Sequence, residues 1–269
     1  MRPLLGTIFA SLCAGATLAS CADSTGPGAS GRQPMSLSFS TSASAGASAS
    51  LSASAGNAST GADVLVITRA QLVLARLELE RVGATCTSDA AAGDDDHGDD
   101  DKCAELELAP SVVDLPVKGG VVTALNVTVP AGTYSSFEAK IRPVEANHGS
   151  KGAGSAAFLA AHPDLAGVSV RVEGTFNGTA FTYTGSPHAK LESAFNPPLA
   201  VTSTGANITV HVDLATWFKT ASGAFIDPAT GNAGRANAAL ISENIKRSFH
   251  AFRDNDHNGN DDDHGAGHS

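Results

Sequence analysis

Alternation of apolar and polar residues in the stretch 121–144, VVTALNVTVPAGTYSSFEAKIRPV, limits the fold of this chain more than any other feature. Residues of one parity from Val121 to Val129 are mostly apolar, and after a turn at 130–133 apolar and charged residues alternate as far as Ile141. A period of two is typical of strands with one buried face. The stretch therefore predicts an antiparallel pair of strands that faces a core.

Other parts of the chain show the same period. The stretch 63–82 is led by β-branched residues and changes its apolar face near Arg76, which predicts two strands joined by a bulge or one long bent strand. Asn177-Gly178 lies between alternating runs and predicts a hairpin. Residues 199–214 form a further strand pattern.

Helical patterns are few. A short connecting helix is expected at 156–159, ended by Pro163, and a second helix at 237–252. Several strands with no β-helix-β rhythm predict a mainly β protein, an antiparallel β-sandwich with one C-terminal helix. Only 5% of residues are aromatic, so the core must consist largely of aliphatic side chains.

Composition sets the domain boundaries. Serine, alanine and glycine dominate the N-terminal part, which predicts a disordered tether, and an acidic tail is expected to be disordered as well. The expected parts are a signal peptide (1–20), a lipidated tether with a first strand at 35–40 (21–62), a sandwich domain with an acidic insertion at 86–103 (63–252), and an Asp/His-rich tail (253–269).

The N-terminus carries an export signal. Met1-Arg2 is positively charged, residues 4–18 are mostly apolar, and Leu18-Ala19-Ser20-Cys21 resembles the bacterial lipobox. That resemblance implies acyl chains on Cys21 and attachment to a membrane. No aspartate directly follows the cysteine, which favours the outer membrane. A plain secretory signal is the alternative.

Two further cysteines, Cys86 and Cys103, remain in the exported chain. An even pair in an oxidising compartment predicts a disulfide, which would close a loop of about seventeen residues and stabilise the fold by roughly 3 kcal/mol. Two free thiols are the alternative.

The net charge of −10 comes from two aspartate runs, within 94–101 and 254–263, and the rest of the chain is close to neutral. This distribution excludes a basic face for nucleic acid. The run DDDHGDDD has no ligand spacing and is typical of a solvated segment. The histidines near the two runs leave a transition-metal site open: His97, His257, His264 and His268.

The tail contains a calcium-loop pattern. Oxygen-bearing residues occupy positions 1, 3, 5, 7 and 9, with Gly259 at position 6, where an EF-hand loop turns sharply. Position 12 is Gly265 instead of the bidentate glutamate, so we expect a dissociation constant of about 0.1 to 1 mM for Ca²⁺. A solvated acidic tail is the alternative. The candidate ligands are Asp254, Asp256, Asn258, Asn260 and Asp262.

The turn at 127–134, VTVPAGTY, and the segment 212–218, VDLATWF, resemble those of uncharacterised bacterial surface lipoproteins that carry a domain of unknown function. Similar features continue at Ile226-Asp227-Pro228 and at 244–249. The resemblance implies a transthyretin-like or immunoglobulin-like sandwich and supplies no catalytic residues.

No nucleophile elbow, zinc-protease motif or phosphate loop occurs, so no catalytic residue is assigned. We expect a lipid-anchored envelope sandwich with a structural or binding role toward an envelope or extracellular partner, and with weak divalent-cation binding. The alternative is a hydrolase or carbohydrate-processing enzyme with its site in the sandwich loops. A pocket of carboxylates beside Trp217 would distinguish that alternative; otherwise Trp217 is expected to pack over a sandwich end.

Overall fold

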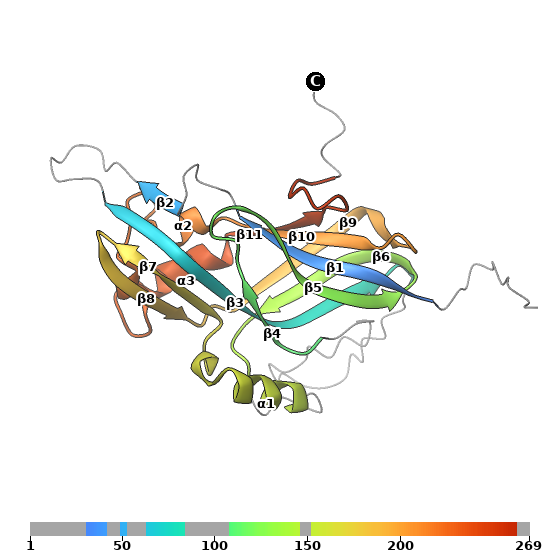
Figure 1. Cartoon of the computed structure of the whole chain (residues 1–269), viewed down its shortest axis with the longest axis horizontal. Helices are drawn as coiled ribbons and strands as arrows, with labels where there is room; N and C mark the ends of the chain where they lie inside the picture. Colours follow the sequence, from blue (N-terminus) through green and yellow to red (C-terminus); the bar gives the residue numbers. More distant parts are fainter. Residues whose placement is uncertain (1–30, 42–48, 53–62, 84–107, 146–151, 263–269) are drawn as a thin grey trace, which may run out of the picture. The chain divides into compact units, whose positions relative to one another are not determined.

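One long strand, β3 (Val64–Arg81), runs through the larger of two sheets (Figure 1). The computed structural model describes residues 31–41, 49–52, 63–83, 108–145 and 152–262, which all belong to one unit, Gly31–Ser269. The larger sheet has the order β8-β7-β3-β6-β9, with β2 and β4 also paired to β3. Its other strands are β2 (Ala49–Ser52), β4 (Ser111–Asp114), β6 (Gly132–Ile141), β7 (Val170–Phe176), β8 (Thr179–Gly185) and β9 (Ala189–Val201).

The smaller sheet has the order β11-β10-β1-β5. Its strands are β1 (Arg32–Thr41), β5 (Gly120–Pro130), β10 (Ala206–Val212) and β11 (Phe249–Arg253). The described pairs are antiparallel except β1 with β10, which is parallel. The two sheets pack against each other, so the predicted mainly β sandwich is confirmed.

Short helices connect the strands: α1 (Gly152–Ala161), α2 (Leu214–Trp217) and α3 (Ala238–Lys246), with 3₁₀ turns η2 (Pro163–Leu165) and η3 (Pro228–Gly231). The connecting helix predicted at 156–159 is confirmed as part of α1. Within the described ranges, none of these helices combines the length and the apolar character needed to cross a membrane.

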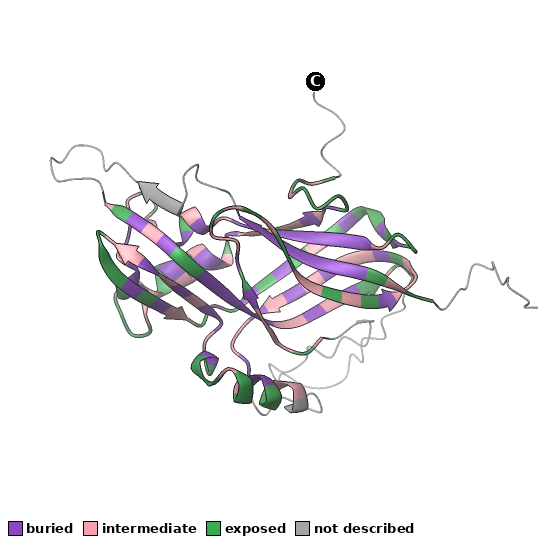
Figure 2. Cartoon of the chain, in the orientation of Figure 1, coloured by how far each residue is buried: buried purple, intermediate pink, exposed green. Residues whose placement is uncertain are grey.

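The core lies between the inner faces of the two sheets (Figure 2). From the smaller sheet Leu37, Phe39 and Ile208 are at most 1% exposed, and from the larger sheet Leu79 and Phe137 are equally buried. The rings of Tyr183 and Phe218 meet edge to face at 5.4 Å, so the segment after α2 covers the β7–β8 end of the larger sheet. Burial of these side chains supplies the main stabilising term of the fold.

The face change predicted near Arg76 is confirmed as an irregularity within one continuous strand. The register of β3 shifts between Leu74 and Arg76 against β6, and a second shift lies between Ile67 and Arg69 against β7. Each shift moves the inward parity by one residue, as an inserted residue in one strand must. The positions of the strand that belong to the main core follow this rule: Leu65 and Ile67, then Ala70, Leu72 and Leu74, then Leu77 and Leu79. Val73, of the opposite parity, is buried in a separate cluster with Phe158 and Leu165.

The predicted pairing of the two strands in 121–144 is wrong. β5 pairs with β1 in the smaller sheet, and β6 pairs with β3 and β9 in the larger sheet, so the chain crosses between sheets at Ala131. The alternation shows that each strand buries one face, but both inner faces of a sandwich produce that pattern. Tyr134 Oη donates to the Pro130 carbonyl at 2.8 Å and fixes the crossing.

The C-terminal part differs from prediction in three places. The helix predicted at 237–252 ends at Lys246, and Phe249–Arg253 is strand β11, which pairs with β10. The strand expected at 199–214 is two strands, the end of β9 and all of β10, joined by a turn at 202–205. The acidic tail expected to be disordered is folded from Asp254 to Asp262 by the hydrogen bonds described below.

The predicted hairpin at Asn177-Gly178 is confirmed between β7 and β8, where φ is 51° at Asn177 and 79° at Gly178. The strand predicted at 35–40 is present as β1 and extends further at both ends.

On the outer face of the larger sheet, Lys190 Nζ lies 2.6 Å from Glu192 Oε1 and 2.9 Å from Glu138 Oε2. These two hydrogen bonds raise the pKa of Lys190, and the bond to Glu192 makes the larger contribution.

Candidate metal centre

The loop 254–262 follows β11 and lies on the outer face of the smaller sheet, beside its strands in Figure 1. A Cβ atom built on Gly259 would lie 2.8 Å from Val121 Cγ2 and 3.8 Å from Ser40 Cβ. The loop therefore reaches from β10 across β1 to β5. We call these nine residues the aspartate loop.

Asp254 holds the start of the aspartate loop against the sheet. Its side chain is fully buried, and its Oδ2 accepts hydrogen bonds from Thr209 Oγ1 at 2.6 Å and from Gly259 N at 3.0 Å. Its Oδ1 accepts from Asn258 N at 2.9 Å. An ionised carboxylate has about four lone-pair sites, so these three donors leave about one site for a further partner.

Asn207 is the centre of the buried polar network below the loop. Its Oδ1 accepts from Ser36 Oγ at 2.7 Å and from Ser38 Oγ at 3.0 Å. Its Nδ2 donates to Thr209 Oγ1 at 3.0 Å and to the carbonyl oxygen of Asp254 at 2.7 Å. The amide thus makes all four of the hydrogen bonds available to it, and it joins β1, β10 and the aspartate loop in one network.

Three predicted ligands come together in this loop. Asp254, Asp256 and Asp262 each offer a carboxylate oxygen, and these oxygens all lie within 4.8 Å of one another. Asp254 is buried, whereas the other two are exposed. None of the three forms a salt bridge with a cationic side chain among the residues described. Like charges this close repel by about 1 kcal/mol per pair in water and by more where water is excluded, so the cluster favours a cation.

The other two predicted ligands support the turn. Asn258 Nδ2 donates to Asp256 Oδ2 at 2.7 Å, and Asn258 Oδ1 accepts from Asn260 N at 2.7 Å. Gly259 has φ of +82°, as the sharp turn at position 6 requires. Asn260 contributes its backbone carbonyl in the predicted pattern. Gly265, at position 12, lies outside the described residues.

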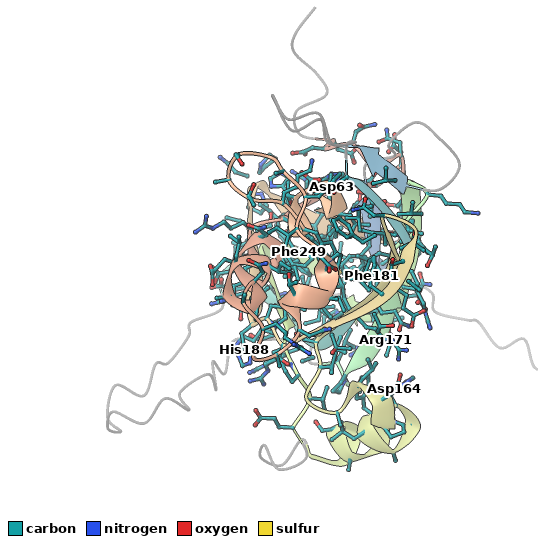
Figure 3. All side chains as sticks on the ribbon, turned by 90° about the vertical axis from the view of Figure 1, so that its left-hand side faces the viewer. Asp63, Asp164, Arg171, Phe181, His188 and Phe249 are labelled. Carbon is teal, nitrogen blue, oxygen red and sulfur yellow. The ribbon has the colours of Figure 1, made fainter. Side chains whose placement is uncertain are left out.

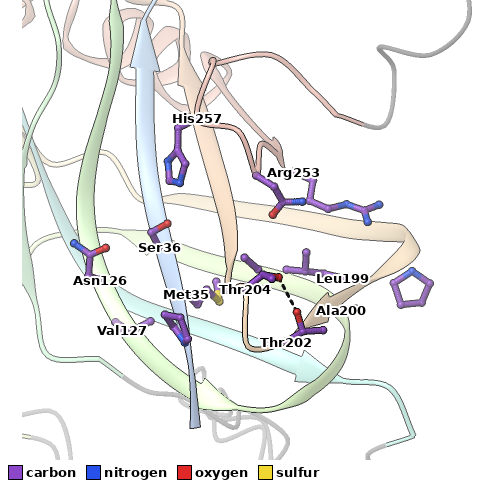
Figure 4. A pocket seen from close by; sticks show the side chains of 15 residues that line it. Met35, Ser36, Asn126, Val127, Leu199, Ala200, Thr202, Thr204, Arg253 and His257 are labelled. Atoms are coloured by element: carbon purple, nitrogen blue, oxygen red, sulfur yellow. Dashed lines mark hydrogen bonds between the residues drawn. The ribbon is translucent and has the colours of Figure 1, made fainter.

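A groove of about 680 Å³ adjoins the aspartate loop (Figure 4). Asn255 and His257 belong to both, and Asn255 Oδ1 accepts from the backbone N–H of Asn207 at 3.1 Å. Hydroxyl and amide groups line the groove together with Met35 and Leu199. The loop therefore has one side on the sheet and one side on an open, mixed polar surface.

The other predicted site residues lie outside the described part of the chain. Cys21, Cys86 and Cys103 belong there, as do His97, His264 and His268 and the run DDDHGDDD. Their expected lipidation, disulfide and ligand roles remain predictions.

Trp217 is fully buried, and its indole Nε1 donates to Ser248 Oγ at 2.7 Å. The expected packing of this tryptophan is confirmed, and Trp217 lines neither the groove beside the aspartate loop nor the cavity described next.

A second cavity of about 530 Å³ lies between β3, β4 and the α1–η2 connection. It contains Asp114 and Asp164, but both carboxylates have cationic partners. Asp114 Oδ1 lies 3.4 Å from Arg69 Nε, and Asp164 Oδ2 lies 2.7 Å from Arg171 Nη1 (Figure 3).

The residues that sequence reasoning missed are Ser36, Ser38, Asn207 and Thr209. Polar side chains at alternate strand positions are normally solvent-facing, and these four follow that pattern in β1 and β10. One signal was available: these outward positions are all small and uncharged, which is unusual for a face in contact with water. Such a composition indicates that this polar face of β1 and β10 is covered, and here the aspartate loop covers it.

The fold and this site define a mainly β sandwich with an aspartate-rich loop packed on its smaller sheet. No family model matches the sequence, and a search of curated proteins finds no match. Among solved structures the chain is similar to MbnP from Methylosinus trichosporium, with 16% sequence identity and a TM-score of 0.37, over 83% of this chain and 99% of that chain. A similarity at this level carries no argument about ligand or activity, so the functional reasoning below rests on geometry.

Proposed function

We propose that this protein is an exported envelope sandwich, attached to the outer membrane through lipid on Cys21, whose aspartate loop binds a divalent cation. The observation that supports cation binding is the convergence of three carboxylates, one of them buried and fixed by the sheet. The lipobox-like sequence supports the attachment. The role is structural or binding toward an envelope or extracellular partner, and it includes no catalytic step.

Calcium fits the ligand set better than magnesium. Oxygens around one Ca²⁺ lie 2.3–2.6 Å from the ion, so two of them are separated by at most about 5 Å, whereas Mg²⁺ at 2.0–2.1 Å limits the separation to about 4 Å. Carboxylate oxygens within 4.8 Å of one another lie inside the calcium limit, and a set of several protein oxygens is typical of calcium sites, whereas Mg²⁺ usually keeps several waters. The candidate donors are oxygen atoms of aspartates, an asparagine and a backbone carbonyl, which are hard ligands of the type calcium prefers.

Binding is expected to be weak and to act on the fold. Three carboxylates without a bidentate glutamate give a dissociation constant of about 0.1 to 1 mM, which suits extracellular rather than cytosolic calcium. Because Asp254 also bonds to Thr209, an ion on the loop stabilises the contact between the loop and the smaller sheet. The cation thereby strengthens the attachment of β11 and the loop.

Isothermal titration calorimetry with CaCl₂ tests the cation site. The unaltered chain should bind with a dissociation constant of about 0.1 to 1 mM, and Asp262→Asn should weaken binding at least about tenfold. Asp261→Asn removes the same charge from the same loop but outside the cluster, so it should bind almost as well as the unaltered chain. Absence of binding heat at millimolar calcium, or equal loss in both variants, would refute the site.

Attachment is tested separately by mass spectrometry of the mature N-terminus. Acyl chains on Cys21, and release of the Cys21→Ala variant from membranes, are the expected results. An unmodified N-terminus in the secreted fraction would instead support the plain secretory signal.

A further inference from the structure

The second cavity lies on the outer face of the larger sheet, where the α1–η2 connection packs over β3. Val73 of β3 is buried there against Phe158 of α1 and Leu165 of η2. A Cβ atom built on Gly154 would lie 3.4 Å from Ala109 Cβ, so α1 also rests on the segment that leads into β4. These contacts hold the walls of the cavity in place. Its volume of about 530 Å³ is within the range of small-molecule sites, about 300–1,000 Å³.

Gln71 is the most informative residue of this cavity. It lines the cavity and is only 7% exposed. Its neighbours Ala70 and Leu72 belong to the main core, so its own side chain points to the outer face of the sheet. No described residue forms a hydrogen bond with its side-chain amide. Buried polar groups are nearly always bonded, and an amide can donate and accept, so Gln71 offers a ligand two donors and an acceptor.

Charged side chains flank Gln71 on the same face. Asp114 of β4 and Arg171 of β7 are its direct cross-strand neighbours. Asp114 pairs with Arg69 at 3.4 Å, which is longer than a usual N–H···O hydrogen bond of about 2.7–3.2 Å, and these two side chains are 66% and 49% exposed. Asp164, the other carboxylate that lines the cavity, pairs with Arg171 at 2.7 Å. Each carboxylate of the lining therefore has an arginine beside it.

This arrangement favours a neutral ligand that carries hydroxyl groups. An anion would lie beside the two carboxylates and a cation beside Arg69, so neither gains net attraction. A hydroxyl group donates and accepts at once, so it can bond to a carboxylate and to the neighbouring guanidinium together. The rest of the lining includes apolar side chains, which suit the carbon skeleton of such a molecule: Pro110, Val112, Phe158 and Leu165.

We propose that this cavity binds a neutral, polyhydroxylated small molecule of about the size of a monosaccharide. The Gln71 amide bonds to the ligand inside the cavity, and Asp114 and Arg69 bond to its hydroxyl groups at the rim. The apolar side chains contact its carbon atoms. The site is on the larger sheet and does not depend on the cation of the aspartate loop.

Saturation-transfer NMR of the unaltered chain in EDTA tests the proposal. The probes are D-glucose, D-galactose and D-mannose, each at about 10 mM, and at least one should receive saturation with a dissociation constant on the order of 1 mM. D-glucuronate and D-glucosamine carry a charge and should bind more weakly than that sugar. EDTA removes calcium, so the result does not depend on whether the aspartate loop binds a cation.

Three variants identify the site. Gln71→Leu should weaken binding of the sugar at least about tenfold, with a urea midpoint that is unchanged or higher, because an apolar group of similar shape replaces an unbonded amide. Asp114→Ala, at an exposed position, should also weaken binding and should fold normally. Gln33→Leu makes the same change on β1, outside the cavity, and should bind like the unaltered chain.

Four results would overturn the proposal. They are the absence of saturation transfer to all of the neutral sugars, tighter binding of a charged probe, and unchanged binding in Gln71→Leu. The fourth is a lower urea midpoint of Gln71→Leu, which would show that the amide stabilises the fold instead of serving a ligand.

Discussion

Replacing Asp254 with alanine in metal-free buffer should destabilise the whole sandwich, although the residue lies in a loop after the last strand of the smaller sheet. Three hydrogen bonds to its carboxylate are lost, from Thr209 Oγ1 at 2.6 Å, Asn258 N at 2.9 Å and Gly259 N at 3.0 Å. The two loop amides reach water once the loop loosens, but Thr209 is fully buried. Its hydroxyl stays on the sheet without its charged acceptor.

The size of the effect follows from these contacts. A hydrogen bond to a charged group contributes about 1.5–3 kcal/mol, and a buried donor left unsatisfied costs about 1–3 kcal/mol. For Thr209 both figures describe the loss of the same bond, so they are not added. Removing the Asp254 carboxylate also removes its repulsion with the exposed Asp256 and Asp262, which offsets about 1 kcal/mol of this destabilisation. We expect the free energy of unfolding to fall by about 2–3 kcal/mol.

Urea unfolding with EDTA, followed by circular dichroism, measures this change. Asp254→Ala should lower the midpoint with no change in the slope m, since the native contacts elsewhere remain. Asp256→Ala is the matched control: Asp256 is exposed and, among the described residues, bonds only to Asn258, so its loss should change stability by less than about 0.5 kcal/mol. A change below about 0.5 kcal/mol for Asp254→Ala, or equal effects of both variants, would refute the role of Asp254.

Three further outcomes are expected. Burial raises the pKa of Tyr183 to about 12, so its contribution to stability is complete below about pH 10 and is lost between about pH 10 and 12. Urea midpoints of Tyr183→Phe should therefore fall less over that interval than those of the unaltered chain, and an equal fall would contradict this. Trp217, the single tryptophan, is fully buried, so iodide should not quench native fluorescence; strong quenching would show that it is accessible. Alkylation of denatured, unreduced protein should leave Cys86 and Cys103 unlabelled, and two labelled thiols would exclude the disulfide.

Periodicity predicted the faces of the strands well, because burial of one face leaves a direct mark on the sequence. In β3 the face change near Arg76 was read from the positions of the leucines, and the register shift lies there. The hairpin at Asn177-Gly178 was equally accessible, since few residue pairs adopt positive φ at two consecutive positions.

Strand partners could not be predicted from the same pattern. β5 and β6 are consecutive and both amphipathic, yet they belong to different sheets. A strand in either sheet buries one face against the opposite sheet, so the alternation is the same whichever strand is its neighbour. Only the end of β9 falls within a predicted strand, because Pro197-Pro198 are typical of a break, whereas an edge strand tolerates prolines that a central strand does not.

In the candidate site, sequence spacing identified the aspartates but not their support. Positions 254, 256 and 262 come together as the loop pattern predicts. The network through Asn207 depends on a parallel contact between β1 and β10, which are separated by more than 160 residues. Local pattern carries no information about contacts at that distance.

Stability measured as a function of calcium concentration tests the central claim most directly. If the aspartate loop binds Ca²⁺ only in the folded state with a dissociation constant of about 0.1 to 1 mM, about 10 mM calcium should raise the free energy of unfolding by roughly 1.4 to 2.7 kcal/mol. Asp262→Asn, with binding weakened at least about tenfold, should gain no more than about 0.4 to 1.4 kcal/mol, and Asp261→Asn should show nearly all of the gain of the unaltered chain. No gain in the unaltered chain, or the same gain in Asp262→Asn, would contradict a cation site in this loop.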